Sequence, residues 1–477
     1  MNSKNVYHYI ALALLYVLPL LLSGVLYVDD MGRAYRGFGW EADGRSIASA
    51  VVFALSFGNG ILSAFPFSTI ISSLIFLYSG YLLTDKLFKL KGVLKVLLSA
   101  FLLTSPFLLE NLAYRYDSLP MALSVLCVAF PFRFLSRKFF VPLAAFGVFL
   151  SLGTYQISAI VFSSFGLVFM MSNALDHKYL EMVKTGVKIA FAFILGYALY
   201  TLFIMYLGTQ LNRVGFISPS LDSLPIITNR VRQYRDIFTS LYDSGYYYIF
   251  WPLLIAFFYG IISSFSKEGF KHLFSLSAFV ILLALLIVSS MMPNLVISTA
   301  WITARTFIAF PLISFSLILY IYKSRATLNS KIILIICSAS TWLSFFLCSQ
   351  FASVLKSNDE YNNYVALSLN SVLSTDLSSE TKNVAVAGSS HGGRSGILIY
   401  SRVPFMETIA PQYISQGWGW GGVYLTKYSY FNWMHNWKSI IEKRCDADVV
   451  FDGGDFLIRR FDGTSNYVLD FIKKGCN

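Results

Sequence analysis

Long apolar runs, separated by short polar connections, follow one another along the first 350 residues of this chain. The first run, Tyr9–Leu26, contains no charged residue and is about as long as a helix that crosses a bilayer. The same pattern predicts about eleven transmembrane helices. Their approximate ranges are 9–27, 66–84, 93–109, 118–134, 139–153, 155–173, 186–207, 249–265, 272–292, 302–322 and 331–350. The pattern therefore predicts an all-α polytopic membrane unit over residues 1–350.

The segment 139–173 is too long for one crossing and short for two. Gly153, Thr154, Tyr155 and Gln156 provide a turn near its middle. Basic residues flank both of its ends, which favours placing the two ends on the same side of the membrane. We therefore expect a hairpin of two helices here.

The pattern changes after residue 350, where the apolar runs become short. A helix is expected through Phe351–Leu373, as a continuation of the last crossing. A strand is expected at Val384–Ala387, and a β-hairpin at Ala447–Phe451 and Phe456–Phe461, around the turn residues 452–455. Residues 351–477 are thus predicted to form a small mixed α/β domain outside the membrane.

Two outer segments, 28–65 and 208–248, are longer than ordinary connections, and loops of that length are usually functional or disordered. The first contains Ile47–Phe57, an apolar stretch too short to cross a bilayer. We expect it to form a helix lying in the membrane interface.

Composition and charge agree with this reading. The chain is 56% hydrophobic and only 13% charged, whereas soluble domains are about 25% charged. Connections on the side of the N-terminus hold sixteen basic and four acidic residues, an excess equal to the whole net charge of +12. Basic loops stay in the cytoplasm, so the N-terminus is predicted to be cytoplasmic and the C-terminal domain to be exported. The basic charge then reflects contact with membrane lipids, and it is no argument for nucleic acid.

Asp29 and Asp30 stand together just after the first apolar run. A carboxylate held at the edge of lipid can act as a general base, and neighbouring guanidinium groups can hold a phosphate. The alternative is a self-neutralising loop of no catalytic role. The further polar and aromatic candidates of this segment are Arg33, Arg36, Trp40, Glu41, Asp43 and Arg45.

Two other outer positions carry basic residues. Arg115 lies between Glu110 and Asp117 in the connection before the fourth predicted crossing, and Arg305 lies at the start of the tenth. Each arginine is either a ligand for an anion or an anchor at the membrane interface.

The exported domain contributes Trp418 and Trp420 within a glycine-rich segment. Their rings either stack on sugars or pack against the membrane surface. Cys445 and Cys476 lie in the same domain, where an oxidising compartment would permit a disulfide between them. The sequence contains no zinc-ligand spacing and no nucleotide-binding fingerprint, which argues against a nucleotide-sugar donor.

A first helix followed by Asp29-Asp30, Arg33, Gly37, Trp40, Gly44 and Arg45 resembles the serotype-converting O-antigen glucosyltransferases, the Gtr family. The many crossings, the Tyr116-Asp117-Ser118 connection and the exported C-terminal domain are similar as well. The resemblance implies a GT-C-type enzyme of the bacterial inner membrane. Such an enzyme moves a sugar from a polyprenyl phosphate, here undecaprenyl-phosphate glucose, to a hydroxyl of the lipopolysaccharide O-antigen on the periplasmic side, by inverting single displacement.

The resemblance also implies roles for the residues. An acidic residue of the first outer loop serves as the base in GT-C enzymes, which points to Asp29 or Asp30, with Glu41 and Asp43 as further candidates. The donor phosphate would contact Arg33, Arg45, Arg115 and Arg305. Acceptor or sugar contacts would come from Trp40, Asp43, Asp117, Trp418 and Trp420.

Two other classes of function stay open at this stage. A flippase for lipid-linked sugars would explain the many crossings, but it predicts charged or broken helices at the bilayer midplane. An O-antigen acyltransferase usually carries a histidine or serine nucleophile within the membrane unit. No cofactor is required by the sequence, which leaves the need for a divalent metal open.

Overall fold

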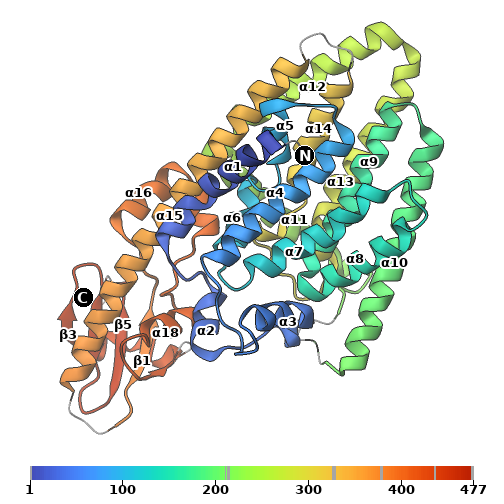
Figure 1. Cartoon of the computed structure of the whole chain (residues 1–477). Coiled ribbons are helices and arrows are strands. Elements are labelled where there is room, and N and C mark those ends of the chain that lie inside the picture. Colours follow the sequence, from blue (N-terminus) through green and yellow to red (C-terminus); the bar gives the residue numbers. More distant parts are fainter. Residues whose placement is uncertain are drawn as a thin grey trace. The chain divides into compact units, whose positions relative to one another are not determined.

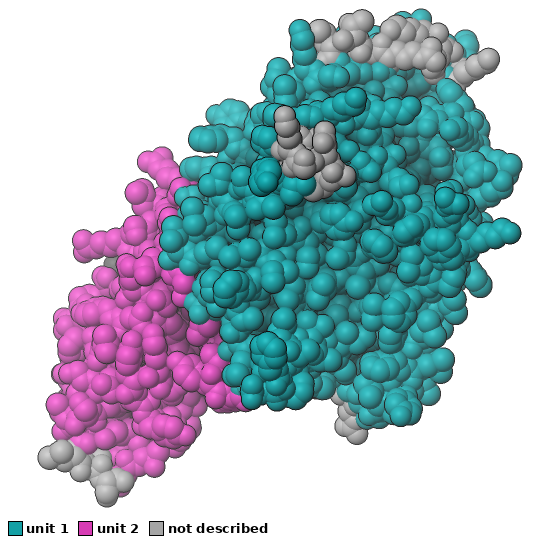
Figure 2. All heavy atoms as spheres, viewed as in Figure 1, with its two compact units in different colours: residues 1–22, 37–349 teal, residues 23–36, 350–477 magenta. Residues whose placement is uncertain are grey.

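The structure, a computed structural model, describes residues 3–209, 211, 215–324, 329–376, 380–434 and 437–473. It is 71% helical, and its strands form one small sheet near the C-terminus (Figure 1). The chain divides into two compact units, coloured separately in Figure 2: unit 1 holds residues 1–22 and 37–349, and unit 2 holds residues 23–36 and 350–477. The sequence-based division had assigned the segment 23–36 to the membrane unit, whereas the structure groups it with the C-terminal residues.

Unit 1 is built from helices. They are α1 (Ser3–Ser23), η1 (Glu41–Asp43), α3 (Ser46–Leu55), α4 (Phe67–Leu87), α5 (Gly92–Ser99), η2 (Pro106–Leu108), α6 (Leu109–Ala113), α7 (Ser118–Ala129), η3 (Phe130–Phe134), α8 (Phe140–Thr154), η4 (Gln156–Ser158), α9 (Ala159–Leu175), α10 (Tyr179–Leu207), η5 (Leu221–Ser223), α11 (Leu224–Leu241), η6 (Tyr242–Tyr246), α12 (Tyr247–Glu268), α13 (Phe270–Val296), η7 (Ala304–Thr306), α14 (Pro311–Lys323) and the first part of α15 (Asn329–Thr375).

The apolar helices of unit 1 pack against one another (Figure 1). α10 packs on both α8 and α9, α13 packs on α9, and α7 packs on α4 and α8. α8 and α9 are separate helices with a break at Tyr155, which confirms the two helices predicted within 139–173. Apolar side chains on the outer faces of α10, α12 and α13, such as Ile194, Ile255 and Ile281, are exposed. Helices that are apolar on all sides are typical of a membrane environment.

Seven helical stretches among the described residues are long and apolar enough to cross a membrane. They are Val6–Ser23, Phe67–Leu87, Gln156–Leu175, Tyr179–Leu207, Leu221–Ser266, His272–Val296 and Asn329–Thr375. Shorter apolar helices occupy Ser46–Leu55, Ser118–Phe134, Phe140–Thr154 and Pro311–Lys323. The chain is therefore a helical membrane protein, while the number of about eleven crossings stays a prediction.

Three predicted helices have different bounds in the structure. The segment 93–109 is not one helix, since α5 ends at Ser99 and a short helix resumes at Pro106, which has no N–H to continue a ladder. In the segment 302–322 the helix α14 begins only at Pro311, because proline suits the first helical position. The first helix ends at Ser23, before the residue 27 expected from the apolar run.

α15 is one continuous helix of 47 residues, as expected from the predicted continuation of the last crossing through Leu373. At about 1.5 Å per residue it is roughly 70 Å long, more than twice the hydrocarbon thickness of a bilayer. A large part of this helix therefore extends beyond the membrane.

Unit 2 surrounds a five-stranded sheet with the order β2-β1-β5-β4-β3. The strands are β1 (Asn383–Ala387), β2 (Asn432–Trp433), β3 (Asp448–Asp452), β4 (Leu457–Arg460) and β5 (Asn466–Asp470). β1 pairs in parallel with β2 and β5, whereas β3, β4 and β5 pair antiparallel. The remaining helices of this unit are α2 (Asp29–Arg36), the end of α15, α16 (Arg394–Arg402), α17 (Phe405–Ile409), α18 (Gly419–Leu425), α19 (Lys438–Glu442) and η8 (Arg444–Asp446).

These elements confirm the strand predicted at 384–387, the hairpin around 452–455 and the mixed α/β character of the domain. The core of unit 2 combines buried residues of α15, such as Leu369, with β-strand residues such as Val386 and Leu469. Met31 of α2 belongs to the same core and is 2% exposed. The segment after the first helix is thus part of the hydrophobic interior of unit 2.

Candidate functional site

Unit 1 contains a cavity of about 620 Å³. Its walls are mostly apolar and include Ile160 of α9, Phe193 of α10 and Met292 of α13. Charged and polar groups also line it, among them Arg45 and Arg305. Guanidinium groups within apolar walls are costly unless they are held by partners, and they are usually present for function. The polar side chains that line the cavity are Asp43, Arg45, Tyr155, Gln156, Ser163, Tyr197, Tyr200, Ser289, Asn294, Thr299, Arg305 and Thr306.

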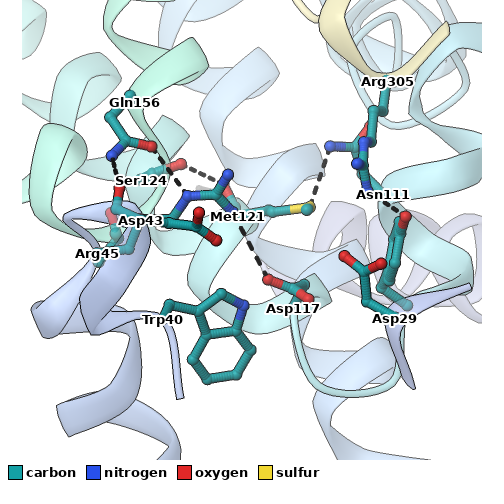
Figure 3. Close-up of polar contacts among 12 residues, drawn as sticks. Asp29, Trp40, Asp43, Arg45, Asn111, Asp117, Met121, Ser124, Gln156 and Arg305 are labelled. Atoms are coloured by element: carbon teal, nitrogen blue, oxygen red, sulfur yellow. Dashed lines mark hydrogen bonds and ion pairs between the residues drawn. The ribbon is translucent and has the colours of Figure 1, made fainter. Parts of the chain in front are cut away.

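Arg45 is held from three directions, and Figure 3 shows its contacts with Gln156 and Asp117. Its Nε donates a hydrogen bond of 2.9 Å to Oε1 of Gln156, and its guanidinium carbon lies 5.1 Å from the centre of the Tyr155 ring. Its Nη1 lies 4.0 Å from Oδ1 of Asp117, at the limit of an ion pair. The Asp117 side chain is only 5% exposed, so this carboxylate is buried close to one cation. Stacking on an aromatic face and a bond from Nε fix the plane of the guanidinium.

The backbone that carries Arg45 is fixed as well. The turn η1 precedes it, and Gly44 lies at φ 74°, a conformation that glycine adopts without strain. The carbonyl oxygen of Gly44 accepts a 3.0 Å hydrogen bond from the Tyr200 hydroxyl of α10. A Cβ atom on Gly44 would lie 2.5 Å from that hydroxyl oxygen. Glycine is therefore required here by both conformation and space.

Arg305 has a similar environment on η7. Its backbone N–H donates a 2.6 Å hydrogen bond to Oε2 of Glu110, which is 5% exposed. Its guanidinium bonds the hydroxyl of Tyr114 and lies 4.9 Å from the centre of that ring. Each of the two cavity arginines is thus paired with a tyrosine ring and has a buried carboxylate near it.

Other predicted residues of unit 1 lie differently. Trp40 is 1% exposed and packs with Ala48 and Val52, so its ring forms part of a small hydrophobic cluster. Glu41 is exposed, and Asp43 is half-buried at the cavity wall. The Arg115 guanidinium lies 4.4 Å from the centre of the Phe65 ring, and Arg115 is not among the described residues that line the cavity.

The acidic pair belongs to unit 2, where it opens α2. Acidic residues in the first turn and Arg33 and Arg36 in the last turn complement the helix dipole, which explains why this polar segment is helical. The Asp29 side chain is 32% exposed and lies 3.9 Å from Nη1 of Arg33. Asp30 is fully buried, and one of its carboxylate oxygens accepts the Tyr27 N–H at 3.4 Å. The two neighbouring aspartates therefore have very different access to solvent.

The aromatic and cysteine candidates of the C-terminal domain also lie in unit 2. Trp418 and Trp420 are half-buried against the core, and the Trp418 ring lies 5.9 Å from that of Tyr413. Burial raises the pKa of the Tyr413 hydroxyl, which accepts the Val28 N–H. Cys445 is disulfide-bonded, whereas the predicted partner Cys476 lies outside the described residues, so this pairing stays a prediction.

Metal-binding chemistry was left open by the sequence. Within the described parts of the chain, no group of three or more His, Cys, Asp or Glu side chains is arranged to hold a metal ion.

Comparison with known proteins identifies the family. The model of the family described as "Glucosyl transferase GtrII" matches residues 18–347, more than half of the chain. The chain belongs to the GtrII glucosyltransferase family. The resemblance of the first outer segment had pointed to the same family.

One curated relative of this GtrII-family glucosyltransferase is described as "Uncharacterized 55.3 kDa protein in gtrB 5'region" of Salmonella phage P22. The two are 28% identical over 260 residues, which cover 52% of this chain and 53% of the relative. The chain thus spans about half the length of the curated relative that it matches. No solved structure gives a significant match.

The sequence did not single out Gln156, Tyr155 or Tyr200 of this glucosyltransferase as site residues. The first two appeared only as turn residues within 139–173, and Tyr200 lies in an apolar run. A signal was present in Gln156, an uncharged polar residue in an otherwise apolar segment. Its partners, however, are 111 and 113 residues away in the sequence, so only the fold shows what it binds.

Proposed function

We propose that this glucosyltransferase moves glucose from a polyprenyl phosphate, undecaprenyl-phosphate glucose, to a hydroxyl of the lipopolysaccharide O-antigen. The observation that carries this proposal is the cavity of about 620 Å³ with apolar walls and the cations Arg45 and Arg305 in its lining. A lipid-phosphate sugar combines an apolar chain with one anionic group. Its chemistry therefore matches both the walls and the cations of the cavity.

The fixed positions of Arg45 and Arg305 support a role for both side chains in stabilising the departing phosphate. As the bond from the anomeric carbon to the phosphate oxygen breaks, negative charge builds up on that phosphate, and fixed cations stabilise it. Arg45 and Arg305 are held by their tyrosine rings and by hydrogen bonds before any donor binds. Little reorganisation is then needed during the reaction.

The base that takes the proton of the acceptor hydroxyl is proposed to be Asp29. The family resemblance points to Asp29 or Asp30, and only Asp29 is partly exposed, with 32% of its side chain accessible. Asp30 is 0% exposed, so an acceptor hydroxyl cannot reach it without movement of α2. Inversion at the anomeric carbon would follow from a single displacement. Glu41 and Asp43 stay as further candidates for this role.

The acceptor and the location follow the sequence-based expectations. The distribution of basic residues favours a cytoplasmic N-terminus and a periplasmic C-terminal domain in the bacterial inner membrane. Trp418 and Trp420 keep part of their rings exposed, which leaves apolar faces for stacking on the sugars of an O-antigen chain.

The test is a transfer assay with the full chain in lipid vesicles. Undecaprenyl-phosphate [¹⁴C]glucose and an isolated O-antigen acceptor are supplied, and the label and the linkage of the product polysaccharide are determined. We expect label in the polysaccharide with inverted anomeric configuration, and none when UDP-[¹⁴C]glucose is the only donor. Movement of the lipid across the bilayer without transfer would indicate a flippase, and an added acetyl group would indicate an acyltransferase; either result would overturn the proposal.

A further inference from the structure

Gln156 connects two parts of the cavity wall that are far apart in the sequence. It opens η4, directly after the break at Tyr155. Its Oε1 accepts the hydrogen bond from Arg45 Nε at 2.9 Å, and its Nε2 donates to the carbonyl oxygen of Asp43 at 2.6 Å. One side chain thus holds both the guanidinium of Arg45 and the backbone of the turn that precedes it.

The partners dictate which way the amide of Gln156 faces. A guanidinium can only donate and a backbone carbonyl can only accept. The amide oxygen must therefore face Arg45 and the amide nitrogen must face Asp43. Among the natural side chains of this length, glutamine alone supplies an acceptor and a donor on one rigid plane.

This bond restricts an otherwise flexible side chain. Arginine has several rotatable bonds, and ordering it costs up to about 2 kcal/mol of conformational entropy. The Tyr155 ring restrains one face of the Arg45 guanidinium, and the carboxylate of Asp117 attracts Nη1 from 4.0 Å. The bond at Nε removes the remaining rotation in the plane, so that the terminal nitrogens keep one direction.

We propose that Gln156 is a positioning residue for donor binding, which orients Arg45 toward the phosphate of the lipid-linked sugar. This inference rests on the proposed function, since it takes the cavity as the donor site. Gln156 acts through Arg45 and makes no contact with the reacting atoms.

Replacements of Gln156 separate the effect of the orientation of Arg45 from the effect of its positive charge. Gln156→Met keeps the length and removes both hydrogen bonds. Gln156→Glu keeps an acceptor for Arg45 but faces Asp43 with a second acceptor, and it neutralises the cation that the phosphate needs. Gln156→Asn keeps the amide but shortens its reach by one methylene.

The experiment measures KM and kcat for undecaprenyl-phosphate glucose, and the inhibition constant of undecaprenyl phosphate, with the full chain in vesicles. We expect Gln156→Met to raise KM and the inhibition constant about tenfold, the size expected when a hydrogen bond to a charged group is lost. Gln156→Glu should raise both by more, about a hundredfold, because it also cancels the positive charge. Gln156→Asn should lie between the native protein and Gln156→Met.

Ser158→Ala is the matched control. Ser158 lies in the same short helix, is buried, and shares a 2.6 Å hydrogen bond with Ser124 of α7. This variant also loses a buried hydrogen bond next to the break, but Ser158 is not among the described residues that line the cavity. We expect its donor KM to stay within about twofold of the native value, in line with a purely local loss of one neutral hydrogen bond.

A double-mutant cycle of Gln156→Met with Arg45→Ala decides whether Gln156 positions Arg45 or has only a general structural role. Once Arg45 is absent, Gln156→Met should have almost no further effect on KM, because two residues that act as a unit are not additive. Additive effects of the two substitutions would show that Gln156 is merely structural. If Arg45→Ala raises KM and Gln156→Met does not, the positioning role is wrong; if Arg45→Ala leaves KM unchanged, the donor-phosphate role of Arg45 and the inference both fail.

Discussion

Each of the two units contains a buried aspartate next to an arginine, and the two pairs differ in the distance between their charged groups. In unit 2, Nε of Arg459 lies 3.0 Å from Oδ2 of Asp470, a residue with 0% exposure. Arg444 lies 3.6 Å from the other oxygen of Asp470, which also accepts the Ile472 N–H at 2.9 Å. In unit 1, Arg45 stays 4.0 Å from Asp117 and lines a cavity.

The difference separates a structural ion pair from a pair suited to binding a ligand. Both carboxylate oxygens of Asp470 are bonded, which offsets the cost of burying its charge between β5 and β4. At 4.0 Å the contact of Arg45 with Asp117 is loose, so the terminal nitrogens of Arg45, which keep one direction, can still bond an incoming anion. The residue types are the same in both places, and only their distances and surroundings differ.

Removing the arginine from each pair should give the largest contrast. Arg459→Ala leaves Asp470 buried with one cation fewer, which should lower the free energy of unfolding of unit 2 by about 3–5 kcal/mol. Arg45→Ala should change stability by less than this, because the Arg45 side chain is 19% exposed and lies 4.0 Å from Asp117, while it lowers kcat/KM for the lipid donor by about 10²–10³-fold. Thermal unfolding and limited proteolysis of the solubilised protein, together with the transfer assay, measure both. Equal destabilisation by the two variants would contradict the comparison.

Asp29 and Asp30 allow the same comparison, between an expected effect on activity and an expected effect on stability, at two adjacent residues. Asp29→Asn should lower kcat by about 10²–10⁴-fold, the usual contribution of a general base, with little change in thermal stability. Asp30→Asn should act mainly on stability, since Asp30 is buried at the start of α2. Transfer rates and unfolding temperatures of both variants distinguish the roles. Full activity of Asp29→Asn in correctly inserted protein would exclude Asp29 as the base.

A substitution of Gly44 tests whether donor binding depends on the backbone conformation that precedes Arg45. Gly44→Ala should cost about 1–3 kcal/mol, because alanine is strained at positive φ, and its Cβ would meet the Tyr200 hydroxyl at 2.5 Å. Gly37→Ala is the control, since Gly37 has φ 61° but no atom within 4 Å of the added Cβ. We expect a higher donor KM for Gly44→Ala and a native KM for Gly37→Ala. A native KM for both variants would mean that this turn does not position Arg45.

The smallest effect is expected at the surface of unit 2, where Asp452 is exposed. The Gly454 N–H and then the Lys473 ammonium lower the pKa of the Asp452 carboxyl. A lowered pKa in the folded state adds stability that is present above the unfolded pKa and is lost as the pH falls through the folded value. Lys473→Met should therefore raise the Asp452 pKa and slightly weaken the hairpin above about pH 4, with the effect fading as the pH falls further; NMR titration follows the pKa. An unchanged pKa would show that the Gly454 N–H alone lowers it.

Much of the fold was predictable from local patterns. Apolar runs marked the helices α4, α10 and α13, and turn residues marked the hairpin of β3 and β4. The errors fell at Pro106 and Pro311, where proline ended or began a helix inside an apolar run. Hydropathy does not respond to a single missing N–H, so it could not show these breaks.

The candidate site was predictable only in part. Arg45 and Arg305 were candidate phosphate ligands because guanidinium groups at the outer edge of the membrane can hold an anion, and both line the cavity. Arg115 was selected for the same reason, yet it lies on the Phe65 ring instead. Trp40 was expected to contact sugar, but its ring is packed in a hydrophobic cluster. Charge and residue type show which groups are unusual, and they do not show which of them meet.

The sequence by itself determined that this chain is a helical membrane protein of a glucosyltransferase family with a small α/β domain, since hydropathy, charge and the motif after the first helix are local properties of the chain. Only the tertiary structure distinguished Asp29 from Asp30 and brought Gln156 to Arg45. Burial and hydrogen bonding depend on residues more than a hundred positions apart, as Gln156 and Asp43 are. Such contacts exist only once the helices have packed.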